Sequence, residues 1–351
     1  MIGVRPNILA MSGYIPGEQL NDPDIIKLNT NENPYPPSPR VFEAVQAALT
    51  CDKLRKYPQP LGNTFRRAAG QVLGIDPDSI LIGNGSDDIL TILTRTFVPE
   101  GGRIVSPTPS YILYRSLAEI QGAQFETVRF GDDWTLPRPW PKPGADLTFL
   151  PNPNSPSGTA LTVTELDRMV GEVGGMLVLD EAYADFCDWN GLALATTYRN
   201  VIVTRSFSKA YSLAGIRFGF AVAPPELVRE LLKVKDSYNC DVLSLAAATA
   251  AIEDQEYFHS VRAKILATRE RMRLALQDFG FAVTPSHSNF LWCRRTDQAV
   301  KPIYEELKRR KMLVRYMNYD GYDGLRISVG TDREIDALLR GIHEILELVK
   351  T

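Results

Sequence analysis

The sequence predicts an α/β fold, with a large domain built on a mainly parallel sheet and a smaller α+β domain. Short apolar segments such as SILIG, MLVLD and NVIVTRS alternate with amphipathic helical segments from about residue 41 onward. Strands that are apolar along their whole length are typical of a parallel sheet covered by helices on both faces. After about residue 224 long helical segments replace this alternation, and the 351 residues are enough for two domains.

Three regions follow from this pattern. Residues 1–40 are rich in Pro, Asn and Gly, so we expect an extended arm instead of a helix, packed on the body or on a partner subunit. Residues 41–246 form the predicted large domain, and residues 247–351 form the small one. In the large domain we expect helices at 41–49, 86–97 and 110–122, the second opening on a Ser/Asp cap, and strands at 79–83, 103–106, 124–130, 146–150, 176–180, 200–206 and 218–222.

The C-terminal part is expected to be richer in helix. Two long helices are predicted at 224–238 and 244–280, and the second joins the domains. Beyond them the pattern predicts helices at 301–311 and 333–349 and strands at 288–293, 312–317 and 324–330.

Composition limits the classes of function. The formal net charge of −3 gives no electrostatic reason to expect a nucleic acid or an anionic membrane as a partner. Four cysteines without a CxxC spacing indicate a reducing compartment, and three scattered histidines are too few for a zinc site. The N-terminus lacks a signal peptide and no segment reaches ~18 consecutive apolar residues, so we expect a cytoplasmic protein without a metal.

Polar residues cluster where predicted strands end, at the edge where open α/β sheets bind ligands. In GNGSDD (83–88) the glycines would let backbone N–H groups approach an anion at the start of a helix. The same segment fits an ordinary turn with Ser86 as the helix N-cap, because its spacing matches neither GxGxxG nor a Walker loop.

Two further strand ends carry ionisable residues. Asp180 ends an apolar strand, where a carboxylate needs a partner such as a protonated ring nitrogen, a helix cap or an ion pair. Lys209 lies in SFSKAYSLAGIRFG beside Ser206, Ser208 and Arg217, which could bind a phosphate next to a nucleophilic amine. A solvated surface lysine explains this grouping poorly. Together the segments supply the groups that a phosphorylated pyridine aldehyde needs.

The segments PNPNSPSGT, LDEAYADF and SFSKAYSLAGIRFG resemble those of the fold-type I pyridoxal-phosphate aminotransferases, in the expected order over almost the whole chain. LNTNENP, KYP with a following LG, the Tyr14-x-Pro-Gly element and GLRISVG are similar to the histidinol-phosphate aminotransferases within that family. The resemblance implies a fold-type I transferase fold, pyridoxal 5'-phosphate as cofactor and a homodimer with shared active sites.

The resemblance also implies roles at the cofactor. Lys209 would hold it as a Schiff base and move protons, Asp180 would pair with the pyridinium nitrogen, and Tyr183 would donate to the ring 3-oxygen. Tyr111 would stack on the ring, although core packing of a helix explains it as well. The phosphate would be held by a larger set that includes a tyrosine of the neighbouring subunit: Gly85, Ser86, Asp87, Ser206, Ser208, Arg217 and Tyr57.

For the substrates, the resemblance implies that Arg326 grips the α-carboxylate and that Tyr14 and Asn33 contact the substrate. Arg315 is a candidate for the substrate's own phosphate, with a surface arginine as the alternative. Histidinol phosphate has no carboxylate, so with that donor Arg326 would have to grip the phosphate.

One position departs from the family pattern. The family has Asn directly before the Pro-x-Gly of the PNPNSPSG loop, where it binds the ring 3-oxygen, but this chain has Ser155 there and Asn154 before it. Either Ser155 makes a weaker contact or the loop shifts so that Asn154 serves.

The sequence therefore predicts transamination between histidinol phosphate and 2-oxoglutarate, as a step of histidine synthesis. The alternatives are an aminotransferase for aromatic amino acids and a decarboxylase acting on phosphothreonine. A regulator that binds the cofactor without catalysis is disfavoured, because no segment remains for a DNA-binding module.

Overall fold

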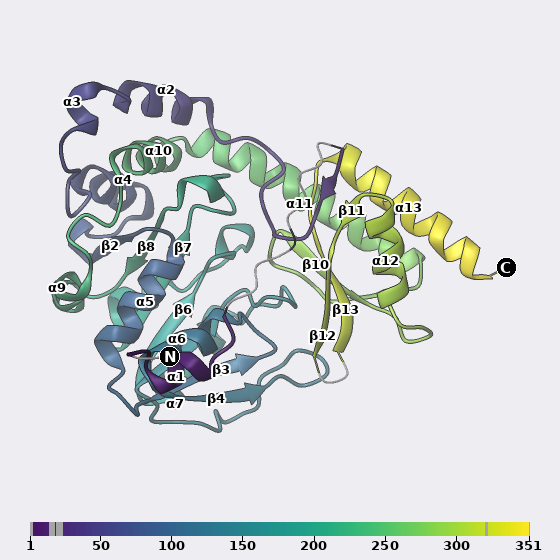
Figure 1. The fold of residues 1–351 in the computed structure, drawn as a ribbon, viewed down its shortest axis with the longest axis horizontal. Helices are drawn as coiled ribbons and strands as arrows, with labels where there is room; N and C mark the ends of the chain where they lie inside the picture. The colour runs from purple at the N-terminus through teal and green to yellow at the C-terminus, as the bar shows by residue number, and fades with distance from the viewer. Residues whose placement is uncertain (1–2, 14–17, 19–23, 320–321, 351) are drawn as a thin grey trace.

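The computed structural model describes residues 3–13, 18, 24–319 and 322–350. A seven-stranded sheet forms its larger part, on the left of Figure 1. Six of the strands run in the same direction, whereas β8 lies antiparallel to both of its neighbours. The spatial order is β2 (Ile80–Gly83), β8 (Gly219–Val222), β7 (Val201–Ser206), β6 (Met176–Asp180), β5 (Leu147–Pro151), β3 (Arg103–Thr108) and β4 (Gln124–Arg129).

Successive residues of a strand point to opposite faces of the sheet, and here the residues on both faces are apolar. Helices therefore cover both faces. In β6, Leu177 and Leu179 pack into one core cluster and Val178 packs into the other. The first cluster includes residues of α2 (Pro39–Ala48), α4 (Asn63–Leu73), α7 (Val163–Val173), α8 (Leu192–Thr197) and α10 (Val242–Glu253). The second includes residues of α5 (Ser86–Phe97), α6 (Leu113–Gln121) and α9 (Pro225–Val234).

A four-stranded antiparallel sheet forms the smaller part, on the right of Figure 1. Its order is β12 (Arg315–Tyr319), β13 (Tyr322–Ser328), β10 (Phe290–Arg294) and β9 (Ala282–Val283). Its core packs against α11 (Gln255–Asp278), α12 (Lys301–Arg309) and α13 (Asp332–Lys350). This arrangement, together with the large sheet, confirms the predicted fold class.

The N-terminal segment contacts both parts. The short helix α1 (Pro6–Ala10) lies against α6, where Asn7 Nδ2 donates to the Glu119 carbonyl oxygen at 2.7 Å. Farther along, β1 (Ile26–Lys27) pairs in parallel with β11 (Met312–Leu313) of the small part. The prediction of an arm without helix was wrong at α1, because Pro6 fits the first position of a helix, where its missing N–H costs nothing.

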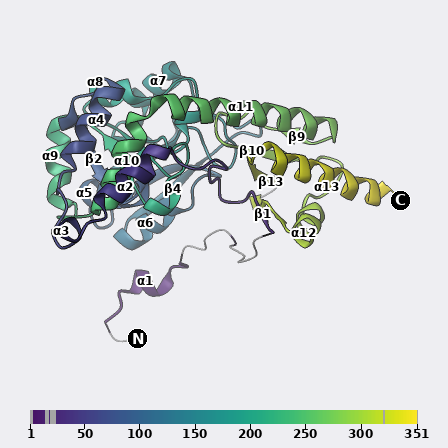
Figure 2. The ribbon, with the colours of Figure 1, turned by 90° about the horizontal axis from the view of Figure 1, so that it is seen from above.

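The single helix predicted at 244–280 is two helices that meet at Asp254. This residue ends α10 and begins α11, and its side chain accepts from the Tyr257 amide at 3.4 Å. The side chain that caps α11 competes with continuation of α10. Apolar periodicity alone does not reveal such a cap. Figures 1 and 2 show α11 continuing toward the small part. Residue 246, the predicted domain boundary, falls inside α10, and the proposed boundaries stay predictions.

Candidate active site

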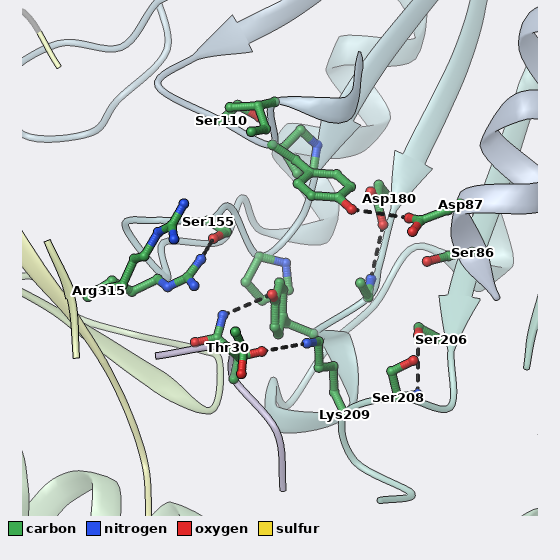
Figure 3. A pocket seen from close by; sticks show the side chains of 18 of the residues that line it. Thr30, Ser86, Asp87, Ser110, Ser155, Asp180, Ser206, Ser208, Lys209 and Arg315 are labelled. Carbon is green, nitrogen blue, oxygen red and sulfur yellow. Dashed lines mark hydrogen bonds between the residues drawn. The ribbon is translucent and has the colours of Figure 1, made fainter. Parts of the chain in front are cut away.

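A cavity of about 330 Å³ lies where the carboxyl ends of the large-sheet strands face β12 and β13. Figure 3 shows Ser86, Ser206 and Ser208 on one side of it and Arg315 with Ser155 on the other. Most of the predicted site residues line it, namely Ser86, Asp87, Tyr111, Ser155, Asp180, Tyr183, Ser206, Ser208, Lys209, Arg217, Arg315 and Arg326.

The N-terminus of α5 opens onto this cavity. Its N-cap residue is Gly85, with φ of 82° and no side-chain cap, so the predicted Ser/Asp cap was wrong. A Cβ at Gly85 would lie 2.6 Å from Arg217 Nη2, so only glycine lets the arginine approach the helix terminus. Since the first amides of a helix attract anions, the guanidinium and the helix terminus together form a cradle for an anion.

Arg217 is fixed beside this terminus by local contacts. It adopts a left-handed conformation with φ of 57°. Its Nη1 donates to Ser208 Oγ at 3.2 Å, and Nη2 lies 3.7 Å from Asp87 Oδ2. Ser206 Oγ accepts from the Ser208 amide at 3.2 Å. The end of β7 and the loop after it therefore place two hydroxyls and one guanidinium together, as a phosphate group requires.

Lys209 is half-buried between the large sheet and the N-terminal segment. Its Nζ donates to the Thr30 carbonyl oxygen at 3.0 Å and lies 5.7 Å from the centre of the Tyr183 ring. A single carbonyl and an aromatic face hold the amine at the cavity wall (Figure 3).

Asp180 is buried at the end of β6. Burial raises its pKa, and the hydrogen bond from Tyr114 opposes that rise. Tyr114 Oη donates to Asp180 Oδ2 at 2.6 Å, and the Ala182 amide donates to Oδ1 at 3.2 Å. Among the described residues no cationic side chain forms an ion pair with Asp180. The fully buried Tyr114 was not predicted, because its position three residues after Tyr111 indicated only a helix.

Asn31 lies in the LNTNENP segment, but no role was predicted for it. Its Nδ2 donates to Tyr183 Oη at 3.0 Å. It adopts φ of 58°, and its backbone amide and side-chain oxygen both bond to Ser328 Oγ. The Tyr183 hydroxyl is therefore oriented by a residue that lies far away in the sequence, beyond the reach of motif spacing.

The loop after β5 places its two candidate residues differently. Ser155 lines the cavity and its Oγ accepts from Arg326 Nη1 at 2.9 Å. Asn154 is 2% exposed, does not line the cavity, and donates to the Pro109 carbonyl oxygen at 3.2 Å and to Ser157 Oγ at 3.0 Å. Within the described structure, Ser155 is thus the one in reach of a ligand.

Two arginines meet at the opposite end of the cavity. Arg315 and Arg326 are direct partners across the antiparallel pair β12–β13, and both line the cavity. Arg326 Nη2 also donates to the Asn29 carbonyl oxygen at 2.9 Å. Like charges directly opposite each other destabilise a sheet, so this pair indicates a site for an anion.

The remaining predicted residues have varied positions. Tyr111 Oη donates to Asp87 Oδ1 at 3.2 Å beside the cavity. Asn33 does not line it and donates from Nδ2 to the Ala210 carbonyl oxygen at 3.0 Å. Tyr57 is 80% exposed and stacks on Tyr238, with ring centres 4.4 Å apart. Tyr14 lies outside the described residues.

The residues present fit a phosphorylated, electron-withdrawing pyridine ring. The anion cradle at Gly85, the amine of Lys209 and the buried carboxylate of Asp180 surround one cavity. A buried carboxylate without a cation beside it is suited to a ring nitrogen that carries a proton.

Comparison with known proteins agrees with this geometry. The family model for class I and II aminotransferases matches residues 23–342. The chain is 50% identical over 347 residues to a histidinol-phosphate aminotransferase of Rhodopirellula baltica, covering 98% of this chain and 96% of that protein. It is 44% identical over 346 residues to histidinol-phosphate aminotransferase 1 of Trichormus variabilis, covering 97% and 98%. The chain belongs to the histidinol-phosphate aminotransferase family.

A solved structure of the same family agrees. The histidinol-phosphate aminotransferase of Sinorhizobium meliloti, in complex with pyridoxal-5'-phosphate, has a TM-score of 0.87 and 25% sequence identity, with 99% of each chain covered. Family membership makes this chain a pyridoxal-phosphate-dependent aminotransferase. In the described residues no helix is long and apolar enough to cross a membrane.

Proposed function

We propose that this aminotransferase moves the amino group of histidinol phosphate to 2-oxoglutarate, as part of histidine synthesis. The observation that carries the proposal is the cross-strand pair Arg315 and Arg326 at the end of the cavity away from Lys209. Two guanidiniums match the double charge and the several oxygens of a phosphate monoester. An aromatic amino acid offers only one carboxylate to this pair.

In the proposed reaction the pyridoxal phosphate, when bound, supplies an aldehyde that accepts the amino group and a ring that withdraws electrons from the substrate carbon. Lys209 would hold the cofactor, and its Nζ would then take up and return the proton that moves during the transfer. Asp180 would keep the ring nitrogen protonated, and Tyr183 would donate to the ring 3-oxygen. Tyr111 would cover the ring.

The phosphate of the cofactor is held by the α5 terminus with Gly85, Ser86 and Asp87, and by Ser206, Ser208 and Arg217. The carboxylate Asp87 has a different task within this set. It lies 3.7 Å from Arg217 and accepts from Tyr111, so it orients the cation and the ring-covering phenol. We propose that Ser155, instead of Asn154, stands beside the ring, because it lines the cavity.

We further propose a cytoplasmic homodimer in which Tyr57 reaches the cofactor of the partner. The Tyr57 side chain is 80% exposed although its ring stacks on Tyr238, and this exposure suits a residue that completes a neighbouring site. Large apolar side chains nearby in sequence are also exposed, namely Phe42, Leu49 and Leu54. Large apolar side chains that remain exposed to solvent in this number suit a surface that another subunit covers.

A panel assay tests the proposed substrate. The purified holoenzyme is given 2-oxoglutarate with histidinol phosphate, phenylalanine or phosphothreonine, and glutamate and carbon dioxide are measured. We expect kcat/KM for histidinol phosphate to exceed that for phenylalanine by about 100-fold, since charged hydrogen bonds are each worth about 1.5–3 kcal/mol. Faster turnover of phenylalanine, or carbon dioxide release from phosphothreonine without glutamate, would contradict the proposal.

A further inference from the structure

Tyr319 lies beside the two arginines and was not singled out by any sequence motif. Residues alternate in direction along a strand, so Arg315, Met317 and Tyr319 of β12 share one face, and all three line the cavity. The Tyr319 ring packs with Met317 against a core cluster that contains residues of the large part and Trp292 of β10 in the small part. The ring therefore belongs to the core where the two parts of the molecule meet, and Tyr319 lies close to Arg326 and Arg315 at the arginine end of the cavity.

The Tyr319 hydroxyl has a weak partner. Its Oη donates to Met317 Sδ at 3.6 Å, and a thioether sulfur is a poor acceptor. Burial raises the pKa of Tyr319, whereas the charges of Arg326 and Arg315 oppose that rise, so the phenol is neutral and close enough to feel both cations. A neutral donor that can exchange a weak acceptor for a strong one is suited to an incoming oxyanion.

We propose that Tyr319 is a specificity residue, which donates a hydrogen bond to the phosphate of the amino donor and not to the carboxylates of 2-oxoglutarate. This inference rests on the proposed function. The transferase must accept both substrates in one cavity. A phosphate monoester has three terminal oxygens in a tetrahedral arrangement, whereas a carboxylate has two in a plane that one guanidinium satisfies. A third donor beside the two arginines therefore favours the phosphate.

The contacts of Arg326 support this difference between the phosphate and the carboxylates. Its Nη1 and Nη2 donate to Ser155 Oγ and to the Asn29 carbonyl oxygen, each at 2.9 Å, and these two contacts fix the plane of the guanidinium. A fixed plane suits in-plane contact with a carboxylate. A tetrahedral group in the same place directs an oxygen out of that plane, and the Tyr319 hydroxyl is the donor that we assign to this oxygen.

The test is Tyr319→Phe in the holoenzyme, because phenylalanine keeps the ring that packs on this core cluster. We expect KM for histidinol phosphate to rise about tenfold, the value of one hydrogen bond to a charged group, with KM for 2-oxoglutarate unchanged. The Ki of glycerol 3-phosphate, a phosphate monoester without an amino group, should rise equally, and the Ki of glutarate should stay constant.

Tyr316→Phe is the matched control. Tyr316 is on the opposite face of β12 and its ring stacks on Tyr304, with centres 5.7 Å apart, inside the small part. It should leave all four constants unchanged.

Three results would overturn the inference. They are unchanged constants in Tyr319→Phe, equal rises for the phosphate and carboxylate ligands, and a loss confined to kcat. A wild-type enzyme that does not turn over histidinol phosphate would contradict the proposed function and this inference together. An active wild type with an unaffected Tyr319→Phe variant would contradict this inference alone.

Discussion

At one end of the cavity, side chains follow directly on strands of the large sheet and are held by their near neighbours in sequence. Ser206, Ser208 and Arg217 contact one another within a dozen residues of chain. At the other end, Arg326 is held by Ser155 and by the Asn29 carbonyl oxygen, which are 171 and 297 residues away. The end proposed for the cofactor is thus a local structure, and the end proposed for the substrate exists only in the complete fold.

The largest expected effect tests the cofactor end. Lys209→Ala should lower kcat by about 10⁴-fold or more, because it removes both the nucleophile and the proton carrier. The variant should also lose the visible absorbance that the wild type acquires when pyridoxal phosphate is added, which a spectrophotometric titration measures. Retention of that absorbance would show that another group holds the cofactor.

The second effect tests the buried carboxylate. Asp180→Asn keeps an oxygen that can accept from Tyr114 but loses the charge, so we expect cofactor binding to persist and kcat to fall by about 10²-fold. Equilibrium dialysis measures the binding, and steady-state assays measure the rate. Near-normal turnover would mean that Asp180 only caps the loop after β6.

The third effect tests the substrate end, where one arginine is proposed to serve two anions. Arg326→Ala should raise KM about 10- to 100-fold, the range for lost charged hydrogen bonds. We expect the rise to be larger for 2-oxoglutarate, because Arg315 still meets the phosphate of histidinol phosphate. Arg315→Ala is the matched variant and should reverse the order of the two losses. Equal losses for both substrates in both variants would show that the pair acts as one unit.

The same contrast explains what the sequence could predict. In an open α/β sheet, ligands bind at the carboxyl ends of the strands, so polar residues that follow apolar strands are candidates for a ligand site. Asp180 and Lys209 were predicted in this way from their local sequence. Tyr114, Tyr319 and the contact of Asn31 with Tyr183 were not predicted, because each position depends on elements that are distant in the sequence. The break at Asp254 was missed for the related reason that a cap depends on local hydrogen bonding and not on apolar periodicity.

The smallest expected effect concerns stability without cofactor. Burial raises the pKa of Asp180 above its value in the unfolded chain, so the folded protein binds this proton more tightly. The resulting stability is fully present below the unfolded pKa and is lost as pH rises through the folded one. Asp180→Asn lacks this dependence. Its free energy of unfolding should therefore improve relative to the wild type as pH rises above about 4, the pKa of an unfolded aspartate, by about 1.4 kcal/mol for each tenfold difference in proton affinity.

Urea denaturation of both cofactor-free proteins over this pH range measures the difference. A difference that stays constant with pH would show that Asp180 is as well solvated as in the unfolded chain. Adding pyridoxal phosphate should reverse the trend, because a protonated ring nitrogen beside Asp180 favours the ionised carboxylate. In that case burial of the Asp180 carboxylate beside the Tyr114 phenol destabilises the cofactor-free protein, and cofactor binding offsets this cost.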